Sequence, residues 1–367
     1  MLVRTRLQEI RKLRGISAAD LACRVKVSRQ TIYAIEDGSF VPNTTVSLQL
    51  SRALDVTVEE IFSLADERAV APIRATLLGG DQATNEGQPV RVCRVGERVV
   101  AVPISFLPAY LPTADGIVES RTRLTVSINS PAGVADDGKR LLLAGCDPAL
   151  SLLSDSLHSS EIEIISVPCS SRRALEWLKQ GSVHAAGSHL RDRTTGDYNL
   201  PIIRRLLPEG SVRVVTFAVW EQGLVLRRGN PKGIRSLADL GGKDVTLINR
   251  EKGSGSRDLL DSGLRQLGVR PEQFNGYNSI AQGHLAAAYA VAAGMADCCI
   301  APRSASRCFG LDFVPLAVER FDLSFTQASL ELPAAKALLD LLNRSSLRRK
   351  LESIAGYDTA HTGEVLM

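Results

Sequence analysis

The stretch Asn249-Arg250-Glu251-Lys252-Gly253-Ser254-Gly255-Ser256-Arg257 decides how most of this chain is interpreted. Before it, residues 244–248 form a short apolar, β-branched run that predicts a buried strand. After it, leucines repeat at helical spacing up to Gly268. The first N–H groups of such a helix have no internal partner, and glycines let the backbone approach a guest closely. The stretch therefore predicts an anion cradle at a strand-to-helix turn.

The same stretch allows two other interpretations. A serine N-cap on an ordinary helix explains the serines equally well. A nucleotide-binding loop is excluded, because the spacing GxxxxGK[ST] is absent.

The composition is that of a soluble globular protein. The 367 residues, 44% hydrophobic and 23% charged, suffice for two or three domains. A net charge of +4 is too small to indicate a polyanionic partner by itself. The seven cysteines lack CxxC spacing, so they predict neither a disulfide framework nor a metal site and fit a reducing compartment. Without a signal-peptide pattern or a membrane-length apolar run, we expect a cytoplasmic protein with no membrane partner.

Residues 1–66 show helical periodicity with a capping residue before most helices. Ser17 and Ser28 precede two short helices joined by a tight turn, and Asn43 and Thr57 begin two more. Two helices joined in this way are the helix-turn-helix arrangement. The nearly balanced charges would also suit a helical module for protein contacts. Basic residues near the first helix and the turn favour DNA: Arg4, Arg6, Arg11, Lys12, Arg14, Arg24, Lys26 and Arg29.

This all-α segment resembles the Cro-repressor or xenobiotic-response-element family of DNA-binding domains. The resemblance rests on residues 21–22, 27–32 and 35–38, Pro42, Leu50 and residues 53–54. It implies that the helix after Ser28 enters the major groove of an operator, with Arg29, Gln30 and Tyr33 at base edges and Ser28 and Thr31 at phosphates. One departure is Ala18, where the family often has a glutamine that contacts DNA.

Residues 67–140 lose the helical periodicity. The runs 91–95 and 98–102 flank a Gly-Glu pair and predict a hairpin, and residues 124–128 alternate as a strand. The piece 114–117 is similar to part of the small β-barrel domain of molybdopterin-biosynthesis proteins. A β-rich linker domain without chemical candidates is the simpler interpretation.

From residue 141 to residue 367, strands and helices alternate. This order predicts an α/β domain with parallel sheets, whose ligands lie at the carboxyl ends of the strands. Asp147 is placed as an N-cap after the strand at 141–144, with Pro148 at the first helical position. The runs 212–220 and 223–226 would carry the chain across between two halves.

This segment looks like the cytoplasmic molybdate-binding-protein-like domain, a type 2 periplasmic-binding-protein fold often fused to DNA-binding domains. The matching pieces are residues 144–150, 187–190, 195–199, 222–224, 229–231, 249–250, 253–257, 276–277, 292–297, 311–316 and 319–323. The resemblance implies two lobes hinged near 220–226 and 313–317, which close on a ligand. Three positions depart from the pattern of this family. Ser256 stands where the family usually has threonine, and Gly283-His284 where it usually has a Thr-His pair. Cys298-Cys299 stand where it usually has small residues.

The loop ends supply the candidate ligand-binding residues. They are Cys146, Asp147, Ser188, His189, Asn249, Arg250, Ser254, Gly255, Ser256, Arg257, His284 and Glu319. Each has an ordinary alternative: Asp147 would cap rather than contact an oxyanion, which it would repel, and Arg257 would pair with Asp258 or Asp261. His189 and His284 are as readily satisfied polar residues as ligands. No catalytic residue, metal ligand or cofactor is predicted.

The leading hypothesis is a ligand-responsive transcription regulator, not an enzyme, which binds double-stranded operator DNA as a homodimer. Its effector would be a small oxyanion, molybdate or tungstate by the resemblance, or another small organic or anionic metabolite. A DNA-bound scaffold that has lost its ligand is a further alternative. An enzyme built on Cys146, Asp147 and His189 lacks any supporting motif.

Overall fold

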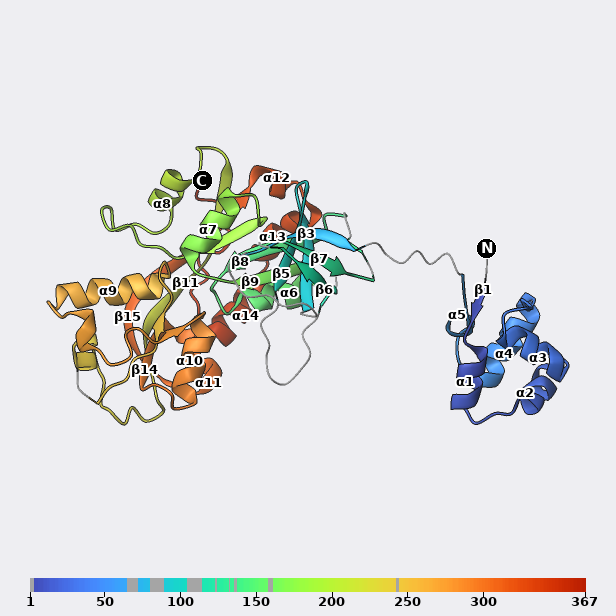
Figure 1. The fold of residues 1–367 in the computed structure, drawn as a ribbon. Helices are drawn as coiled ribbons and strands as arrows, with labels where there is room; N and C mark the ends of the chain where they lie inside the picture. Colours follow the sequence, from blue (N-terminus) through green and yellow to red (C-terminus); the bar gives the residue numbers. More distant parts are fainter. Residues whose placement is uncertain are drawn as a thin grey trace. The chain divides into compact units, whose positions relative to one another are not determined.

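The computed structural model describes residues 3–64, 72–79, 89–103, 114–122, 124–131, 133–134, 137–157, 161–241 and 244–367. The chain divides into two compact units, Met1–Pro72 and Ile73–Met367, each with its own hydrophobic core. Figure 1 colours both along the chain. The predicted boundary at residue 66 lies outside the described residues, and a separate domain over 67–140 stays a prediction.

The first unit is the helical bundle that the capping pattern predicts. Its described helices are α1 (Leu7–Leu13), α2 (Ala18–Val25), α3 (Arg29–Glu36), α4 (Thr44–Leu54) and α5 (Val58–Ile61), with the paired strands β1 (Val3–Thr5) and β2 (Phe62–Leu64). Ser17, Ser28, Asn43 and Thr57 each accept a backbone N–H of the first turn, which confirms them as N-caps. The buried helix faces meet in one apolar core.

The second unit begins with a closed β-barrel. Its strands follow the order β3-β5-β4-β6-β7: β3 (Ile73–Leu77), β5 (Arg98–Pro103), β4 (Pro89–Val95), β6 (Gly116–Arg121) and β7 (Thr125–Asn129). The predicted hairpin is confirmed by the antiparallel pairing of β4 with β5 around a turn at Gly96. Closure leaves the sheet without a free edge.

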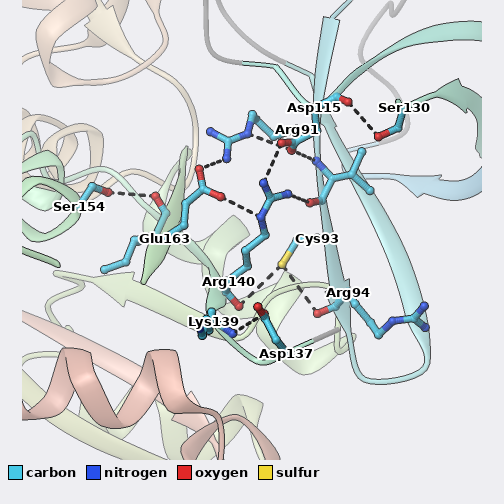
Figure 2. A network of polar contacts seen from close by, with 12 residues as sticks. Arg91, Cys93, Arg94, Asp115, Ser130, Asp137, Lys139, Arg140, Ser154 and Glu163 are labelled. Carbon is cyan, nitrogen blue, oxygen red and sulfur yellow. Dashed lines mark hydrogen bonds and ion pairs between the residues drawn. The ribbon is translucent and has the colours of Figure 1, made fainter. Parts of the chain in front are cut away.

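A polar network fastens the barrel to the domain that follows it (Figure 2). Asp115 accepts from Arg91 Nε at 3.0 Å, from Arg140 Nη2 at 2.9 Å and from the backbone N–H of Val92 at 2.8 Å. Glu163 pairs with the same two arginines. Because Arg91 and Asp115 belong to the barrel region, and Arg140 and Glu163 to the next two strands, the alternating charges join the two structures.

The rest of the unit is the predicted two-lobed α/β domain. Its sheet of six strands has the order β14-β11-β15-β10-β8-β9 within the described residues. The 15-residue strands β11 (Val212–Leu226) and β15 (Asp312–Thr326) pair antiparallel and run through both lobes, as Figure 1 shows. Lobe 1 carries β8 (Arg140–Gly145), β9 (Glu163–Pro168) and β10 (Ala185–Ser188); lobe 2 carries β12 (Asn249–Arg250), β13 (Ile280–Ala281) and β14 (Cys298–Pro302). The residues predicted as hinges lie in the two long strands.

The position of one predicted strand and the direction in which some strands pair were predicted wrongly. The run 244–248 was expected to be a strand, but β12 comprises only Asn249–Arg250, and Thr246 and Leu247 make isolated bridges. Parallel pairing holds for β8 with β9, β8 with β10 and β12 with β13, whereas β11, β14 and β15 pair antiparallel. The crossing strands carry the chain from one lobe to the other and back, so they run in opposite directions.

Helices cover the sheets of both lobes. They are α6 (Leu150–Leu157), α7 (Ser171–Lys179), α8 (Leu200–Leu206), η2 (Leu237–Gly241), α9 (Gly255–Gln266), η3 (Pro271–Gln273), α10 (His284–Ala292), α11 (Arg303–Phe309), α12 (Gln327–Leu330), α13 (Pro333–Leu342), α14 (Ser345–Lys350) and η4 (Leu351–Ala355). Helices α9, α10 and α11 surround β14 in lobe 2 (Figure 1). Among the described residues, no helix has both the length and the apolar character needed to span a bilayer.

Candidate functional site

The exposed face of α3 is the candidate DNA-binding surface. Arg29, Gln30 and Tyr33 are exposed on this helix, whereas Ile32 and Ile35 are buried in the core. The Arg29 guanidinium donates to the Tyr33 hydroxyl at 2.8 Å and lies over its ring. This contact restricts the Arg29 side chain in advance, so less conformational entropy is lost if it binds DNA.

Three polar groups near this face have roles within the bundle. Ser28 Oγ accepts the Thr31 N–H at 3.0 Å and lies 2.8 Å from Thr31 Oγ, so both hydroxyls support the start of α3. Arg11 is one of the basic residues whose position predicts DNA binding, but it is only 8% exposed. Its Nη2 lies 3.0 Å from Glu36 Oε2, so Arg11 fastens α1 to α3 and is not available to a phosphate.

The second candidate site lies where the two lobes meet. Cys146 follows β8, and Ser188 and His189 stand at the end of β10. Gly255 and His284 are the first residues of α9 and α10 in lobe 2. All five are buried, and the two imidazole centroids are 5.6 Å apart. We call the following set the interlobe cluster: Cys146, Asp147, Ser188, His189, Trp220, Gln222, Arg250, Gly255, Ser256, His284 and Glu319.

Glu319 orients the His189 ring. The Glu319 carboxylate lies 2.7 Å from Nδ1 of His189 and also accepts from Trp220 Nε1 at 3.4 Å. Burial disfavours a charged ring, but the Cys146 sulfur and the Glu319 carboxylate outweigh it and raise the pKa of His189 to about 10. Both ring nitrogens therefore carry protons. Nε2 is a buried donor that makes no hydrogen bond to a protein nitrogen or oxygen atom, and the Cys146 sulfur lies within 4.8 Å of the ring's ligand atom.

Arg250 orients the His284 ring in a different way. Arg250 Nη1 lies 2.7 Å from His284 Nδ1, while the rest of the guanidinium binds Glu251 at 2.8 and 2.9 Å. Burial, with the positive charges of Arg250 and His189, lowers the pKa of His284 well below its usual value. A guanidinium only donates, so Nδ1 of this neutral ring accepts and Nε2 carries the proton. That N–H has no protein partner either.

Further polar atoms of the cluster are buried without partners. They are Ser188 Oγ, Asp147 Oδ2 and Gln222 Oε1. The other oxygen of Asp147 accepts from the backbone N–H of Ala149 at 2.7 Å and from the Tyr357 hydroxyl at 2.8 Å. Burial raises the pKa of Asp147 to about 7, so its carboxyl group is in part protonated at neutral pH.

The predicted cradle meets lobe 1 directly. A Cβ atom on Gly255 would lie 2.5 Å from the His189 ring, so only glycine allows α9 to begin against that imidazole. Ser254 is an N-cap that accepts the Arg257 N–H at 3.3 Å. Ser256 accepts from Gln222 Nε2 at 2.6 Å. The N-terminus of α9, which is the positive end of the helix, therefore lies beside the His189 ring.

Several predicted residues have side chains that are bound elsewhere. Asn249 donates to the carbonyl of Tyr277 at 3.0 Å. Arg257 donates to Asp261 at 3.2 Å and lies over the Tyr277 ring at 4.0 Å, which is the alternative role foreseen for it. Their direct contact with a ligand stays a prediction, as it does for every candidate residue.

Sequence reasoning missed Trp220 and Tyr357 and gave no ligand role to Gln222. The Trp220 ring centroid lies 5.1 Å from that of His189 and 5.5 Å from that of Tyr357. Gln222 is a buried polar residue in a mostly apolar strand, but Glu221 beside it is polar too, so the signal was weak. No local pattern pointed to Tyr357, which reaches Asp147 from near the C-terminus.

A cavity of ≈ 500 Å³ leads from the surface to the cluster. His189, Gly255 and Glu319 line its inner end. Arg193 and Asp258 line it from opposite lobes, with 3.7 Å between their charged groups. The lobes are therefore in contact around the cavity.

Three side chains of the cluster also have the composition of a metal site. Ligand atoms of Cys146, His189 and His284 all lie within 4.8 Å of one another. A thiolate and two imidazoles suit Zn²⁺, which takes a lone pair from each ring. In the geometry present, however, Arg250 occupies Nδ1 of His284 and leaves the proton on Nε2. The residues therefore do not fit a metal as they are arranged.

Family models cover both units. A PBP superfamily domain model matches residues 154–343, which are 190 of the 367 residues, and a helix-turn-helix model matches residues 7–61. The chain belongs to the periplasmic-binding-protein (PBP) superfamily. It is a helix-turn-helix regulator fused to a PBP-like ligand-binding domain.

Relatives match each part of this PBP superfamily member. YvgK of Bacillus subtilis is 34% identical over 233 residues, which cover 63% of this chain and 75% of YvgK. The HTH-type transcriptional regulator YgzD of Bacillus subtilis is 34% identical over 65 residues, 18% of this chain and 98% of YgzD.

Two solved structures resemble the PBP-like part. A putative phosphate ABC transporter substrate-binding protein of Clostridium perfringens, with bound phosphate, has a TM-score of 0.45 and 14% identity, covering 59% of this chain and 98% of that one. A tungstate ABC transporter structure from Geobacter sulfurreducens has a TM-score of 0.44 and 15% identity, with the same coverage. At these values neither structure bears on the ligand of this chain.

Proposed function

We propose that this protein is a one-component transcription regulator that binds operator DNA through α3 and a small oxyanion through the interlobe cluster. Molybdate and tungstate are the first candidates, because the resemblance of residues 141–330 implies them. The protein works in the cytoplasm as a homodimer on a two-fold operator. Closure of the lobes on the anion changes the spacing of the two DNA readers and so the affinity for DNA.

One observation supports the anion most directly. Ser188 Oγ, His189 Nε2 and His284 Nε2 are buried donors without protein partners in one cluster. Each such group costs about 1–3 kcal/mol if it stays unsatisfied. An oxyanion accepts from several donors at once, so it would remove these costs together.

The carboxylates in and beside the cluster are compatible with an anion. The carboxylates of Glu319 and Glu251 are already paired with His189 and Arg250. Asp147 would repel an oxyanion when ionised, but burial raises its pKa to about 7. A proton on Asp147 removes that repulsion and adds a donor.

The anion is tested by calorimetry of the full-length protein with molybdate, tungstate, sulfate and phosphate. We expect saturable binding of at least one of them, weakened about tenfold by Ser188→Ala, because a hydrogen bond to a charged group is lost. The Ser188 hydroxyl has no internal partner, so its removal breaks no bond within the protein. Ser324→Ala is the matched control, since Ser324 is another buried serine with an unpartnered hydroxyl outside the cluster. Equal effects of the two variants, or no binding at all, would refute the oxyanion site.

DNA binding is tested with DNA that the wild-type protein selects from a random library. Arg29→Ala is expected to weaken binding about tenfold or more, as for loss of a base contact. The exposed Arg52 on α4 supplies the control Arg52→Ala. If the anion that binds leaves the DNA affinity unchanged, the regulator is not controlled through this cluster.

A larger organic anion is the second candidate effector. The cavity of ≈ 500 Å³ is within the range for small-molecule sites, and Arg191, Arg193 and Arg265 line it. A carboxylate or phosphate of such a ligand would occupy the cluster, and its remainder the cavity. A thermal-shift screen of organic acids separates this candidate from inorganic oxyanions, because only a ligand that fills the cavity would lose affinity in Arg265→Ala.

A further inference from the structure

The interlobe cluster holds donor atoms that suit two opposite kinds of ligand. Cys146, His189 and His284 are close enough for a soft metal cation, while the two Nε2–H groups suit an anion. Which kind binds depends on where the imidazole protons lie, because a ring nitrogen with a proton has no lone pair for a metal.

The orientation of His189 suits a metal cation and an anion equally well. Its Nδ1 faces the Glu319 carboxylate at 2.7 Å. Metal-binding histidines commonly donate their second N–H to a carboxylate, so a cation that displaced the Nε2 proton would find His189 correctly held. An anion would find the same ring protonated and donating.

The tautomer of His284 decides between an anion and a cation, and Arg250 determines that tautomer. The Arg250 side chain is fully buried, and its guanidinium is held on two sides, by Glu251 and by the His284 ring. Because a guanidinium has no acceptor, the contact of 2.7 Å requires the lone pair of Nδ1 and puts the ring proton on Nε2. The positive charge of Arg250 also opposes a cation nearby.

We propose that Arg250 is the positioning residue that determines the ligand class of the cluster: by fixing the tautomer of His284, it makes the site bind an anion and exclude transition-metal cations. This inference rests on the proposed oxyanion function of the same cluster. Ser256 makes the other tautomer of His284 available, because its hydroxyl lies 3.5 Å from Nδ1 and can accept a hydrogen bond from an N–H there once Arg250 is removed. Nε2 would then offer a lone pair next to Cys146 and His189.

The test titrates Co²⁺ into the full-length protein and follows the absorption of cobalt–thiolate and tetrahedral cobalt species. We expect no such signal in the wild type and a saturable signal in Arg250→Met, together with at least about tenfold weaker binding of the oxyanion that binds the wild type. Arg250→Lys restores a donor of similar length, so it should give no cobalt signal and should recover most of the anion affinity. A role of Arg250 in folding alone would not create a cobalt–sulfur band.

Two results would overturn the proposal. One is a cobalt–thiolate signal in the wild type, and the other is an Arg250→Met variant that binds the anion like the wild type and takes up no Co²⁺. If Arg250→Met does not fold, His284→Gln and His284→Ala decide instead. Glutamine supplies an N–H donor and should retain anion binding better than alanine, whereas equal losses would contradict the donor role that Arg250 is proposed to set. Failure of the wild type to bind any oxyanion is a different outcome, which defeats the proposed function itself.

Discussion

At the scale of single residues, burial gives Asp147 an unusually high pKa for a carboxyl group. One carboxyl oxygen is held by Ala149 and Tyr357, and the other has no partner. Desolvation raises its pKa to about 7, while the nearby charge of His189 opposes the rise. The carboxyl group therefore changes its charge near neutral pH, next to a site that is proposed to hold an anion.

The affinity for an oxyanion should depend on pH through Asp147. Protonated Asp147 does not repel the anion, so affinity should fall as pH rises through about 7, by about tenfold between pH 6 and pH 8 for one linked proton. His189 stays protonated over this range because its pKa is about 10. Calorimetry with an oxyanion that does not itself titrate in this range measures the slope. Asp147→Asn keeps an acceptor for Ala149 and Tyr357 and should abolish the slope; a slope that persists would assign the proton to another group.

His184 should make the domain less stable in mild acid. Its Nδ1 accepts the backbone N–H of Leu142 at 2.9 Å, and burial lowers its pKa to about 4. A folded-state pKa below that of the unfolded chain gives stability that is complete above the unfolded value of about 6.5 and is lost as pH falls toward 4. We expect the free energy of unfolding to drop by about 2 kcal/mol from pH 7 to pH 5 through this group. In His184→Asn, whose amide oxygen can replace Nδ1 as acceptor, denaturant melts should show this part of the drop removed, and an unchanged drop would rule His184 out.

At the scale of elements, the start of α9 depends on a glycine at the contact between the lobes. Gly255→Ala would place a Cβ atom 2.5 Å from the His189 ring, so either the ring or the whole helix must move. We expect oxyanion binding at least about tenfold weaker, since displacement of one donor already costs this much. Gly241→Ala is the control, because a Cβ atom there meets nothing within 4 Å. If calorimetry finds the same oxyanion affinity in Gly255→Ala as in the wild type, the prediction is wrong, because the ring or the helix would then move without displacing a donor.

Elements with local signals and most residues of the interlobe cluster were predictable, whereas the contacts within the cluster were not. The N-caps of the first unit, the barrel hairpin and the N-terminus of α9 follow from short patterns of serine, glycine and apolar spacing. The strand expected at 244–248 was misplaced because burial of its side chains gave an apolar run without regular pairing. The contacts of Arg250 with His284 and of Tyr357 with Asp147 join residues 34 and 210 positions apart. The candidate residues predicted from the sequence included Ser188, His189 and His284. No local pattern specifies which ring nitrogen faces a guanidinium, so the protonation of these donors could not be predicted.

At the scale of the whole molecule, the barrel lies between the helix-turn-helix unit and the lobes along the chain. The network of Arg91, Asp115, Arg140 and Glu163 attaches it to the strands of lobe 1 (Figure 2). Burial opposes the charged state of Asp115, but its bonds to Arg140, Val92 and Arg91 hold its pKa below the usual value. The barrel is thus expected to move with lobe 1 when lobe 2 closes on a ligand.

Loosening this attachment should separate ligand binding from DNA binding. Asp115→Asn removes the charge shared by two arginines and should cost about 2 kcal/mol of stability. The interlobe cluster contains none of the four network residues, so calorimetry should find oxyanion affinity within about twofold of the wild type, a difference well below one hydrogen bond. The effect of the oxyanion on DNA affinity should shrink, because lobe 1 no longer holds the barrel firmly. Glu161→Gln, which breaks only the exposed pair with Lys139, should change neither property. If Asp115→Asn transmits the ligand signal at full strength, the signal does not pass through this network.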